Sequence, residues 1–332
     1  MDPLPRFTPP PLLSGPHVQT LLGKALRPRP ATALDVYRLE LEDGDFLDLA
    51  LSPLCADTSR PIVLVLHGLE GSARRRYMLL TYEALLRHGL APVGLNFRGC
   101  SGEPNRTARA YHSGDTEDLA RVTAWLRRRF PDRRLGLVGF SLGGNVVLKY
   151  LGERGEGGTP YHAAVAISVP FDLAAGSLEL ERPGPYTIYR QYFLRSLQRK
   201  AAGKAALIEG RADLSGALSA RTLRAFDDAL TAPLHGFAGA AEYYALSSSG
   251  PYVPRVRTPT LVIQAMDDPF LPEGCVPVGE IQRNPWTTAL LPRYGGHVGF
   301  VSERPGEERF WAEEHAARFV ARHLAFTPTA GP

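Results

Sequence analysis

The sequence has few cysteines and no long apolar run, and both absences exclude whole classes of protein. Its 332 residues include three cysteines, Cys55, Cys100 and Cys275, which lie far apart in the chain. They favour a reduced compartment and argue against a disulfide framework or a zinc site. No apolar run approaches the roughly 18–20 residues that a membrane-spanning helix requires. We therefore expect no transmembrane segment.

The N-terminus lacks the basic segment followed by an apolar stretch that marks a secretory signal. Its first residues, MDPLPRFTPPPLLSGPH, are instead interrupted by prolines. A cytoplasmic location is therefore the default expectation.

The sequence also lacks a strong excess of charge of either sign. It has 38 Lys and Arg against 34 Asp and Glu, which gives a formal net charge of +4. The basic residues are scattered or lie in short helical clusters such as WLRRRF (125–130), and no nucleic-acid-binding motif accompanies them. We expect a solvated basic surface and no nucleic-acid partner.

What the chain does contain is an alternation of apolar runs and amphipathic segments. The runs that predict buried strands are 61–68, 91–99, 134–140, 162–170, 258–266 and 287–294. Helical spacing is found at 72–89, 114–130, 142–154 and 309–324, and a hairpin with an Asp-Gly turn is expected over 36–51. This alternation predicts an α/β fold with a mostly parallel central sheet and helices on both faces.

One segment interrupts this alternation. Residues 171–256 separate two expected core strands by more chain than a crossover helix needs. They contain two stretches of helical character, 186–200 and 221–237. We predict a helical cap inserted into a hydrolase core formed by residues 1–170 and 257–332.

A serine lies between an expected strand and an expected helix. Gly139, Ser141 and Gly143 form a G-x-S-x-G sequence there. In this context the sequence is typical of a nucleophile elbow, because the sharp turn projects the hydroxyl from the sheet and small neighbours allow close packing. A phosphate-type glycine loop or a plain tight turn is the alternative. Since a serine hydroxyl needs a base before it can attack, the prediction depends on partners elsewhere.

Candidate partners follow the last two expected strands. His297 lies in a glycine-rich loop after 287–294, and Asp268 directly precedes a proline after 258–266. Asp267 and Asp172 are the alternative acids. We favour Asp268, because Ser141, Asp268 and His297 then follow one another in the α/β-hydrolase order. In that arrangement serine attacks, imidazole carries the proton and the carboxylate orients the imidazole.

An oxyanion hole needs two N–H donors, and two backbone positions suit this role. Leu142 directly follows the serine, and Leu69 follows the His67-Gly68 pair at the end of the strand 61–68. His67 itself is expected to be structural. No metal and no organic cofactor are required by this machinery, and we expect neither.

Other polar residues permit weaker hypotheses. Arg98 is expected to anchor a nearby carboxylate such as Asp115, and Asp227 and Asp228 to pair with an arginine or to cap a helix. The tyrosines and arginines of 186–200 predict a helix that buries its aromatic face on its own domain. Contact of this helix with an acyl chain or an anionic membrane surface is the alternative. For His17 we expect no catalytic role.

Several phrases spread over nearly the whole chain resemble the YheT-like branch of the α/β-hydrolase fold proteins, which also includes abhydrolase-domain lipases of animals. They are PHVQTLLG (16–23), LVLHGLEGS (64–72), LNFRGCSG (95–102), YHSGDTEDL (111–119), GFSLGGN (139–145), FDDALTAPLHGF (226–237), MDDPFLP (266–272) and GGHVGF (295–300). The resemblance implies carboxylic-ester hydrolysis, with Ser141, Asp268 and His297 on the family's triad. It is a resemblance to the bacterial members that lack the membrane anchor of the animal ones.

The sequence thus predicts a serine esterase that cleaves short- to medium-chain carboxylic esters through an acyl-enzyme. The expected partner is a small-molecule ester or a lipid, with peripheral membrane contact left open. A lipase or phospholipase, a thioesterase or amidase, and a hydrolase-fold binding protein without turnover remain alternatives.

Overall fold

The computed structural model describes residues 6–272 and 274–325. Within them an eight-stranded sheet has the order β1-β2-β4-β3-β5-β6-β7-β8. The strands are β1 (Asp35–Glu40), β2 (Phe46–Leu51), β3 (Ile62–Leu66), β4 (Ala91–Leu95), β5 (Leu135–Phe140), β6 (Tyr161–Ile167), β7 (Thr260–Ile263) and β8 (Thr287–Leu290). The hairpin β1–β2 and the pair β2–β4 are antiparallel, and all other pairs are parallel. The predicted mostly parallel sheet is confirmed.

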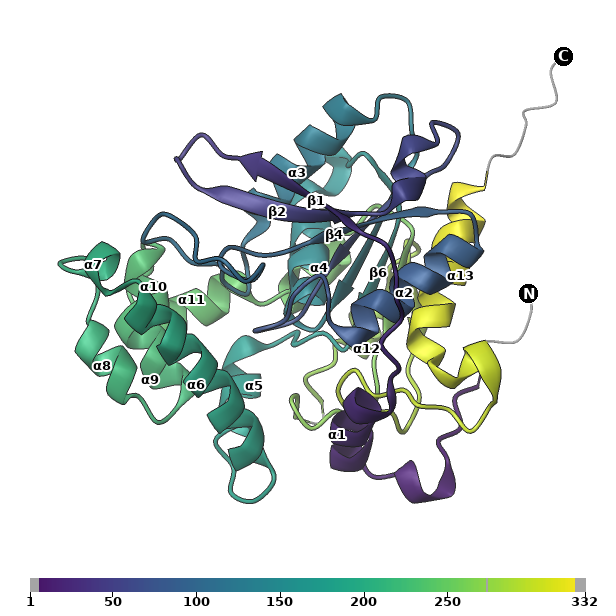
Figure 1. Cartoon of the computed structure of the whole chain (residues 1–332). Coiled ribbons are helices and arrows are strands. Elements are labelled where there is room, and N and C mark those ends of the chain that lie inside the picture. The colour runs from purple at the N-terminus through teal and green to yellow at the C-terminus, as the bar shows by residue number, and fades with distance from the viewer. Residues whose placement is uncertain (1–5, 273, 326–332) are drawn as a thin grey trace, which may run out of the picture.

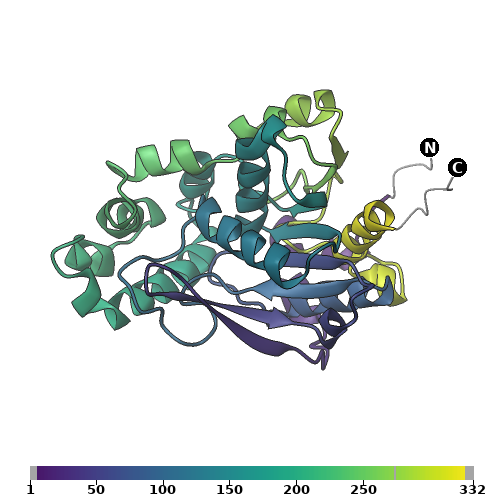
Figure 2. The ribbon, with the colours of Figure 1, turned by 90° about the horizontal axis from the view of Figure 1, so that it is seen from above.

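Helices cover both faces of this sheet (Figures 1 and 2). On one face lie α2 (Arg76–Arg87) and α13 (Trp311–Leu324). On the other lie α3 (Thr116–Arg129), α4 (Leu142–Arg154) and α12 (Val278–Arg283). The apolar faces of these helices and the sheet between them form two core layers, as predicted for an α/β-hydrolase fold.

The strand β3 explains why the central runs read as continuously apolar. Its sequence is IVLVL, and every side chain in it is fully buried. Ile62, Leu64 and Leu66 belong to the core layer on one face, whereas Val63 and Val65 belong to the layer on the other. A strand covered on both faces has no polar side to present, because successive side chains point to opposite faces.

Five of the six predicted strands end before their apolar runs do, since burial continues after the strand pairing has ended. The predicted runs 91–99, 258–266 and 287–294 correspond to the shorter β4, β7 and β8. Beyond two of these strands the chain turns while still covered by other elements, so that Phe97 and Ala265 are each 1% exposed. Apolar sequence therefore extended past the true strand ends.

Between β6 and β7 the chain forms a group of helices, which we call the insert. It comprises α5 (Leu173–Glu179), α6 (Tyr186–Gly203), α7 (Ala205–Ile208), α8 (Leu214–Ser219), α9 (Leu223–Phe226), a π-helical turn (Asp227–Thr231), α10 (Ala232–Leu234) and α11 (Ala240–Ser247). The insert has an apolar cluster of its own and lies at one end of the sheet (Figures 1 and 2). These helices occupy residues 171–256, for which a cap was predicted. That the insert is a separate cap domain remains a prediction.

The N-terminal helix α1 (Pro16–Leu26) was not predicted. Prolines frame it, and Pro16 occupies its first turn, where the missing N–H costs nothing. None of the helices in the described residues is long and apolar enough to cross a bilayer.

Candidate active site

Ser141 lies at the sharp turn between β5 and α4. Its φ of 52° and ψ of −120° belong to a region that non-glycine residues rarely adopt. The backbone N–H of Ser141 donates to the carbonyl of Ile167 at 2.8 Å, which fixes the turn against β6. A side chain at Gly143 would meet the carbonyls of Leu66 and His67 at 2.7 Å. The sharp turn and this close approach explain why position 143 of the motif is a glycine.

His297 and Asp268 meet Ser141 at the carboxyl edge of the sheet. His297 Nε2 lies 2.9 Å from Ser141 Oγ, and its Nδ1 lies 2.9 Å from Asp268 Oδ2. The ring of Phe270 stacks on the imidazole with centroids 4.1 Å apart. The three predicted side chains therefore form one continuous hydrogen-bonded chain.

The carboxylate of Asp268 is held by more than the histidine. Its Oδ1 accepts the backbone N–H of Phe270 at 2.9 Å, and its Oδ2 accepts the side-chain amide of Gln264 at 3.1 Å. These bonds orient both oxygens toward Nδ1 of His297. Gln264 was not singled out by sequence reasoning, although it is a polar residue within the apolar run before the two aspartates.

The two alternative acids have other partners. Asp267 Oδ1 accepts the backbone N–H of Gly296 at 2.9 Å, and burial raises the pKa of this carboxyl to about 6. Asp172 caps α5 by accepting the backbone N–H of Ala175 at 2.9 Å. The structure records no contact of either side chain with His297.

Both candidate oxyanion donors face the same cavity as Ser141. Leu142 opens α4, and its N–H has no acceptor within the described residues. In the loop after β3 the N–H of Gly68 donates to Tyr77 and that of Glu70 to Tyr111, at 3.0 and 2.8 Å. Leu69 lies between them, and its N–H is likewise without an acceptor in the part of the chain described. The tyrosine hydroxyls thus hold the loop and leave the middle amide available.

Glu70 connects this loop to the insert, a role that sequence reasoning missed. Its carboxylate accepts bonds from Tyr111 at 2.6 Å, Lys200 at 2.8 Å and Ser196 at 2.5 Å. Burial alone would raise the pKa of Glu70, but the Lys200 ammonium and these hydrogen bonds more than offset it and lower the pKa. Because Lys200 and Ser196 belong to α6, the insert anchors the residue next to Leu69.

Helix α1 anchors the loop of His297, and this role was also missed. Thr20 Oγ1 accepts the backbone N–H of His297 at 2.9 Å. The side-chain amide of Gln19 makes two bonds to the backbone of Val301, at 2.9 and 3.1 Å. Arg27 donates to the carbonyl of Gly299 at 2.8 Å. The phrase PHVQT is therefore a support for residues 295–301, which we call the His297 loop.

Two cavities adjoin Ser141 and His297. The inner one, of about 120 Å³, is mostly apolar and runs under the insert. Its apolar lining consists mainly of Leu173, Leu180, Phe193, Leu197, Leu223 and Phe270. The outer one is an open groove of about 960 Å³ between α1, α6 and the loop after β3. Together they provide a site with one enclosed and one open side.

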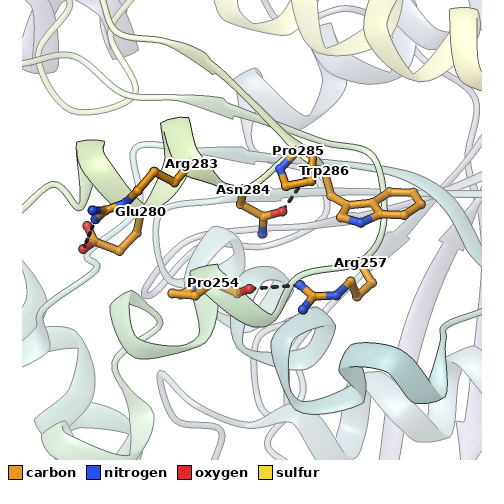
Figure 3. A pocket seen from close by; sticks show the side chains of 7 residues that line it. All are labelled: Pro254, Arg257, Glu280, Arg283, Asn284, Pro285 and Trp286. Carbon is orange, nitrogen blue, oxygen red and sulfur yellow. Dashed lines mark hydrogen bonds and ion pairs between the residues drawn. The ribbon is translucent and has the colours of Figure 1, made fainter.

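A third depression, drawn in Figure 3, lies at the amino ends of β7 and β8. It has about 560 Å³ and is formed by α12 and the segments that precede β7 and β8. Arg257, Glu280, Arg283 and Trp286 line it, and Arg283 pairs with Glu280 at 2.9 Å. It contains none of the three hydrogen-bonded residues and is not a candidate active site.

His67 agrees with its predicted structural role. It is fully buried, and its Nε2 accepts the backbone N–H of Phe97 at 3.3 Å while Nδ1 donates to the carbonyl of Gly68 at 2.8 Å. Burial lowers its pKa to about 4, so it is neutral at neutral pH.

The partner expected for Arg98 was wrong. Its guanidinium binds Asp118, Asp45 and Asp43, at 2.7, 2.9 and 2.8 Å, rather than Asp115. Asp115 instead precedes α3 and caps this helix by accepting the N–H of Asp118.

Of the paired aspartates in the insert, one caps a helix and neither contacts an arginine in the part of the chain that the structure describes. Asp228 accepts the N–H of Ala240 at the start of α11 at 2.6 Å. Asp227 accepts hydroxyl hydrogen bonds from Thr231 and Tyr244, at 2.6 and 2.7 Å, and it faces the inner cavity.

Comparison with known proteins agrees with this fold. The chain matches the α/β hydrolase fold family over residues 61–298. The Pyrococcus furiosus esterase Pf2001 has the same fold, with a TM-score of 0.57 at 18% identity over 88% of this chain and 93% of that one. Est1E from Butyrivibrio proteoclasticus gives a TM-score of 0.56 at 14% identity, over 88% and 99% of the two chains.

Sequence relatives are closer. YheT of Escherichia coli (strain K12) is 40% identical over 93% of this chain and 91% of its own length. Human phospholipase ABHD3 is 30% identical over 85% of this chain and 70% of its own. Monoacylglycerol lipase of Saccharomyces cerevisiae is 33% identical over 80% of this chain, which spans 60% of that protein. The chain belongs to the YheT-like branch of the α/β-hydrolase fold family, whose relatives include lipases and phospholipases.

Proposed function

We propose that this protein is a serine hydrolase that cleaves carboxylic esters through an acyl-enzyme. The observation that carries the proposal is the unbroken chain from Ser141 Oγ through His297 to Asp268, with both links at 2.9 Å. A serine hydroxyl becomes nucleophilic when an oriented base takes its proton. Here His297 supplies the base, and its hydrogen bond to Asp268 supplies the orientation.

In the proposed reaction Ser141 Oγ attacks the ester carbonyl while His297 Nε2 takes its proton. Asp268 holds the imidazole and stabilises its charged form. The carbonyl oxygen becomes an oxyanion, which accepts the N–H groups of Leu69 and Leu142. Each such donor contributes on the order of 3 kcal/mol to the stability of the transition state. His297 then protonates the leaving alcohol, and a water activated by the same imidazole releases the acid.

The two cavities suggest how an ester lies in the site. The inner cavity is small and mostly apolar, which suits a short or medium acyl chain. The groove is open and larger, and it suits the alcohol portion. This assignment accounts for the presence of an enclosed apolar side and a wide exit on either side of Ser141.

Hydrolysis of nitrophenyl esters of increasing acyl length tests the proposal. We expect Ser141→Ala to lower kcat by roughly a millionfold, as removal of the nucleophile does in other serine hydrolases. A fluorophosphonate probe should label the wild type and leave the variant unlabelled. Equal rates in the two proteins, or a wild type that resists the probe, would contradict the proposal and favour a binding protein. Parallel thioester and amide substrates identify the bond that is preferred.

A further inference from the structure

Helix α1 has its amphipathic character inverted. Its polar and small residues Gln19 and Gly23, and Arg27 directly after the helix, point inward and are buried. Its apolar side chains point outward, with 37–45% of their surfaces exposed: Val18, Leu21, Leu22 and Leu26. Helices on a protein surface normally bury their apolar side chains. The inward face is explained by the support of the His297 loop, whereas the apolar side chains of the outward face are only partly covered by the described residues.

The start of α6 extends this apolar surface. Ile188 and Tyr192 are 57% and 42% exposed, although neighbouring Tyr189 is buried. The two helices are in contact, since Lys24 of α1 lies 4.6 Å from the centre of the Tyr192 ring. They flank the lower edge of the molecule in Figure 1. Both line the open groove that leads to Ser141.

Cations surround the same groove. Lys24, Arg29, Arg74, Arg75 and Arg76 all line it. Arg74, Arg75 and Arg76 donate to backbone carbonyls or to a tyrosine hydroxyl, and none of the five pairs with a carboxylate among residues 6–272 and 274–325. The single carboxylate in the lining, Glu70, is already bound by Lys200. The groove therefore has a strong positive charge, although the whole chain carries only +4.

We propose that the outer faces of α1 and of the start of α6 form a docking surface for an anionic lipid bilayer. Exposed apolar side chains enter the interface between headgroups and acyl chains, while the surrounding cations attract anionic headgroups. The groove then opens onto the membrane, so that an ester lipid has a direct path to Ser141. Only this last step rests on the proposed function. A second copy of the chain is a poor occupant, because it would bring unpaired cations together.

Vesicle flotation with the Ser141→Ala variant tests docking without consuming lipid. We expect binding to vesicles of phosphatidylcholine with phosphatidylglycerol, and much weaker binding to phosphatidylcholine alone or at high salt. Lys24→Glu with Arg29→Glu should weaken binding by at least about thirtyfold, given the usual contribution of a basic residue at such a surface. Leu22→Ser with Leu26→Ser should weaken it by about tenfold or more.

Matched substitutions elsewhere provide the control. Arg127→Glu with Arg128→Glu alters an exposed basic cluster on α3, and Leu207→Ser with Leu218→Ser alters exposed leucines of the insert. These variants should bind vesicles as the parent does. When the same leucine substitutions, Leu22→Ser with Leu26→Ser, are made in the protein that retains Ser141, the rate on a water-soluble ester should equal that of the wild type. Neither leucine lines the groove. Equal binding by all variants would overturn the proposal. So would a concentration-dependent dimer that only the α1 substitutions abolish.

Discussion

Asp267 and Asp268 are adjacent, yet their surroundings give them different roles. Asp268 is 6% exposed and binds the imidazole, a backbone N–H and the amide of Gln264. Asp267 points to the backbone of Gly296, and its other oxygen is buried without a hydrogen-bond partner among the described residues. The turn after β7 therefore separates a carboxylate that can stabilise an imidazolium from one that shapes the His297 loop.

Replacing each aspartate by asparagine should separate these roles. Asp268→Asn offers Nδ1 of His297 an amide in place of a carboxylate, and we expect kcat to fall by about 10⁴-fold, as in other triads. Asp267→Asn keeps an oxygen that accepts the Gly296 N–H, and its kcat should stay within about tenfold of wild type. Steady-state hydrolysis of a nitrophenyl ester measures both. The opposite ranking would assign the acid to Asp267.

Asp227 should make stability depend on pH. Burial raises its pKa from 3.8 to about 6, despite the hydrogen bonds from Thr231 and Tyr244. Its stabilising contribution is thus complete below about pH 4 and is lost as the pH rises through about 6. Asp227→Asn lacks this titration, so the variant should gain up to about 3 kcal/mol relative to wild type over that interval. Urea unfolding at pH 4, 5, 6 and 7 measures the free energy of unfolding of both proteins. A difference between wild type and variant that does not change with pH would refute the prediction.

Helix α1 shows how one element can serve a distant site. Its inward residues bind the backbone of the His297 loop at three positions, through Thr20, Gln19 and Arg27. A loop that contains Gly295 and Gly296 has many accessible conformations, and these bonds select one. The position of the imidazole therefore depends on a helix that contributes no atom to the proposed chemistry.

Loss of one of these bonds should reduce turnover without unfolding the protein. Thr20→Val removes the acceptor of the His297 N–H, and a hydrogen bond of this kind is worth about 1 kcal/mol. We expect kcat to fall roughly five- to tenfold with little change in KM, and Thr20→Ser to restore it. Circular dichroism checks the fold. A Thr20→Val enzyme with the kcat of wild type would show that the His297 loop keeps its conformation without this hydrogen bond.

The difference between what the sequence predicted and what it missed has a physical basis. Ser141 and the neighbouring glycines are local signals, because a turn of this sharpness requires small residues within a few positions. The buried strands were likewise recognisable from continuous apolar runs. The supports Gln19, Thr20, Glu70 and Lys200 depend on contacts between segments up to 282 residues apart. A single sequence carries no periodic signal for such pairs. The helix that contains Gln19 and Thr20 was not predicted, because prolines precede and follow it.

For the molecule as a whole, Arg98 joins parts of the sheet to a covering helix. Its side chain is fully buried after β4, where it binds Asp43 and Asp45 from the hairpin turn and Asp118 from α3. Desolvation of a guanidinium is costly, and here three carboxylates compensate for it. The hairpin β1–β2 is thereby attached to the core by more than its pairing with β4.

Arg98→Met should therefore be among the most destabilising single changes. It leaves buried carboxylates without their counterion, and we expect a loss of about 3–5 kcal/mol in the free energy of unfolding. Asp43→Asn is the matched control, since the Asp43 side chain is 32% exposed and its loss should cost about 1 kcal/mol or less. Urea midpoints compare the two. A similar loss of unfolding free energy in both variants would mean that the bond to Asp43 accounts for most of the stabilisation by Arg98.

The pairing of Gln19 with Val301 has a consequence for the order of assembly. These residues are separated by 282 positions, so the bonds by which α1 supports the His297 loop cannot form until residue 301 has been synthesised. Contacts of such long range form late, because closing the chain costs entropy that only the finished core repays. The nascent protein would then carry its strained serine turn well before the imidazole is held beside it, which postpones the proposed reactivity until the His297 loop has been made and is bound by α1.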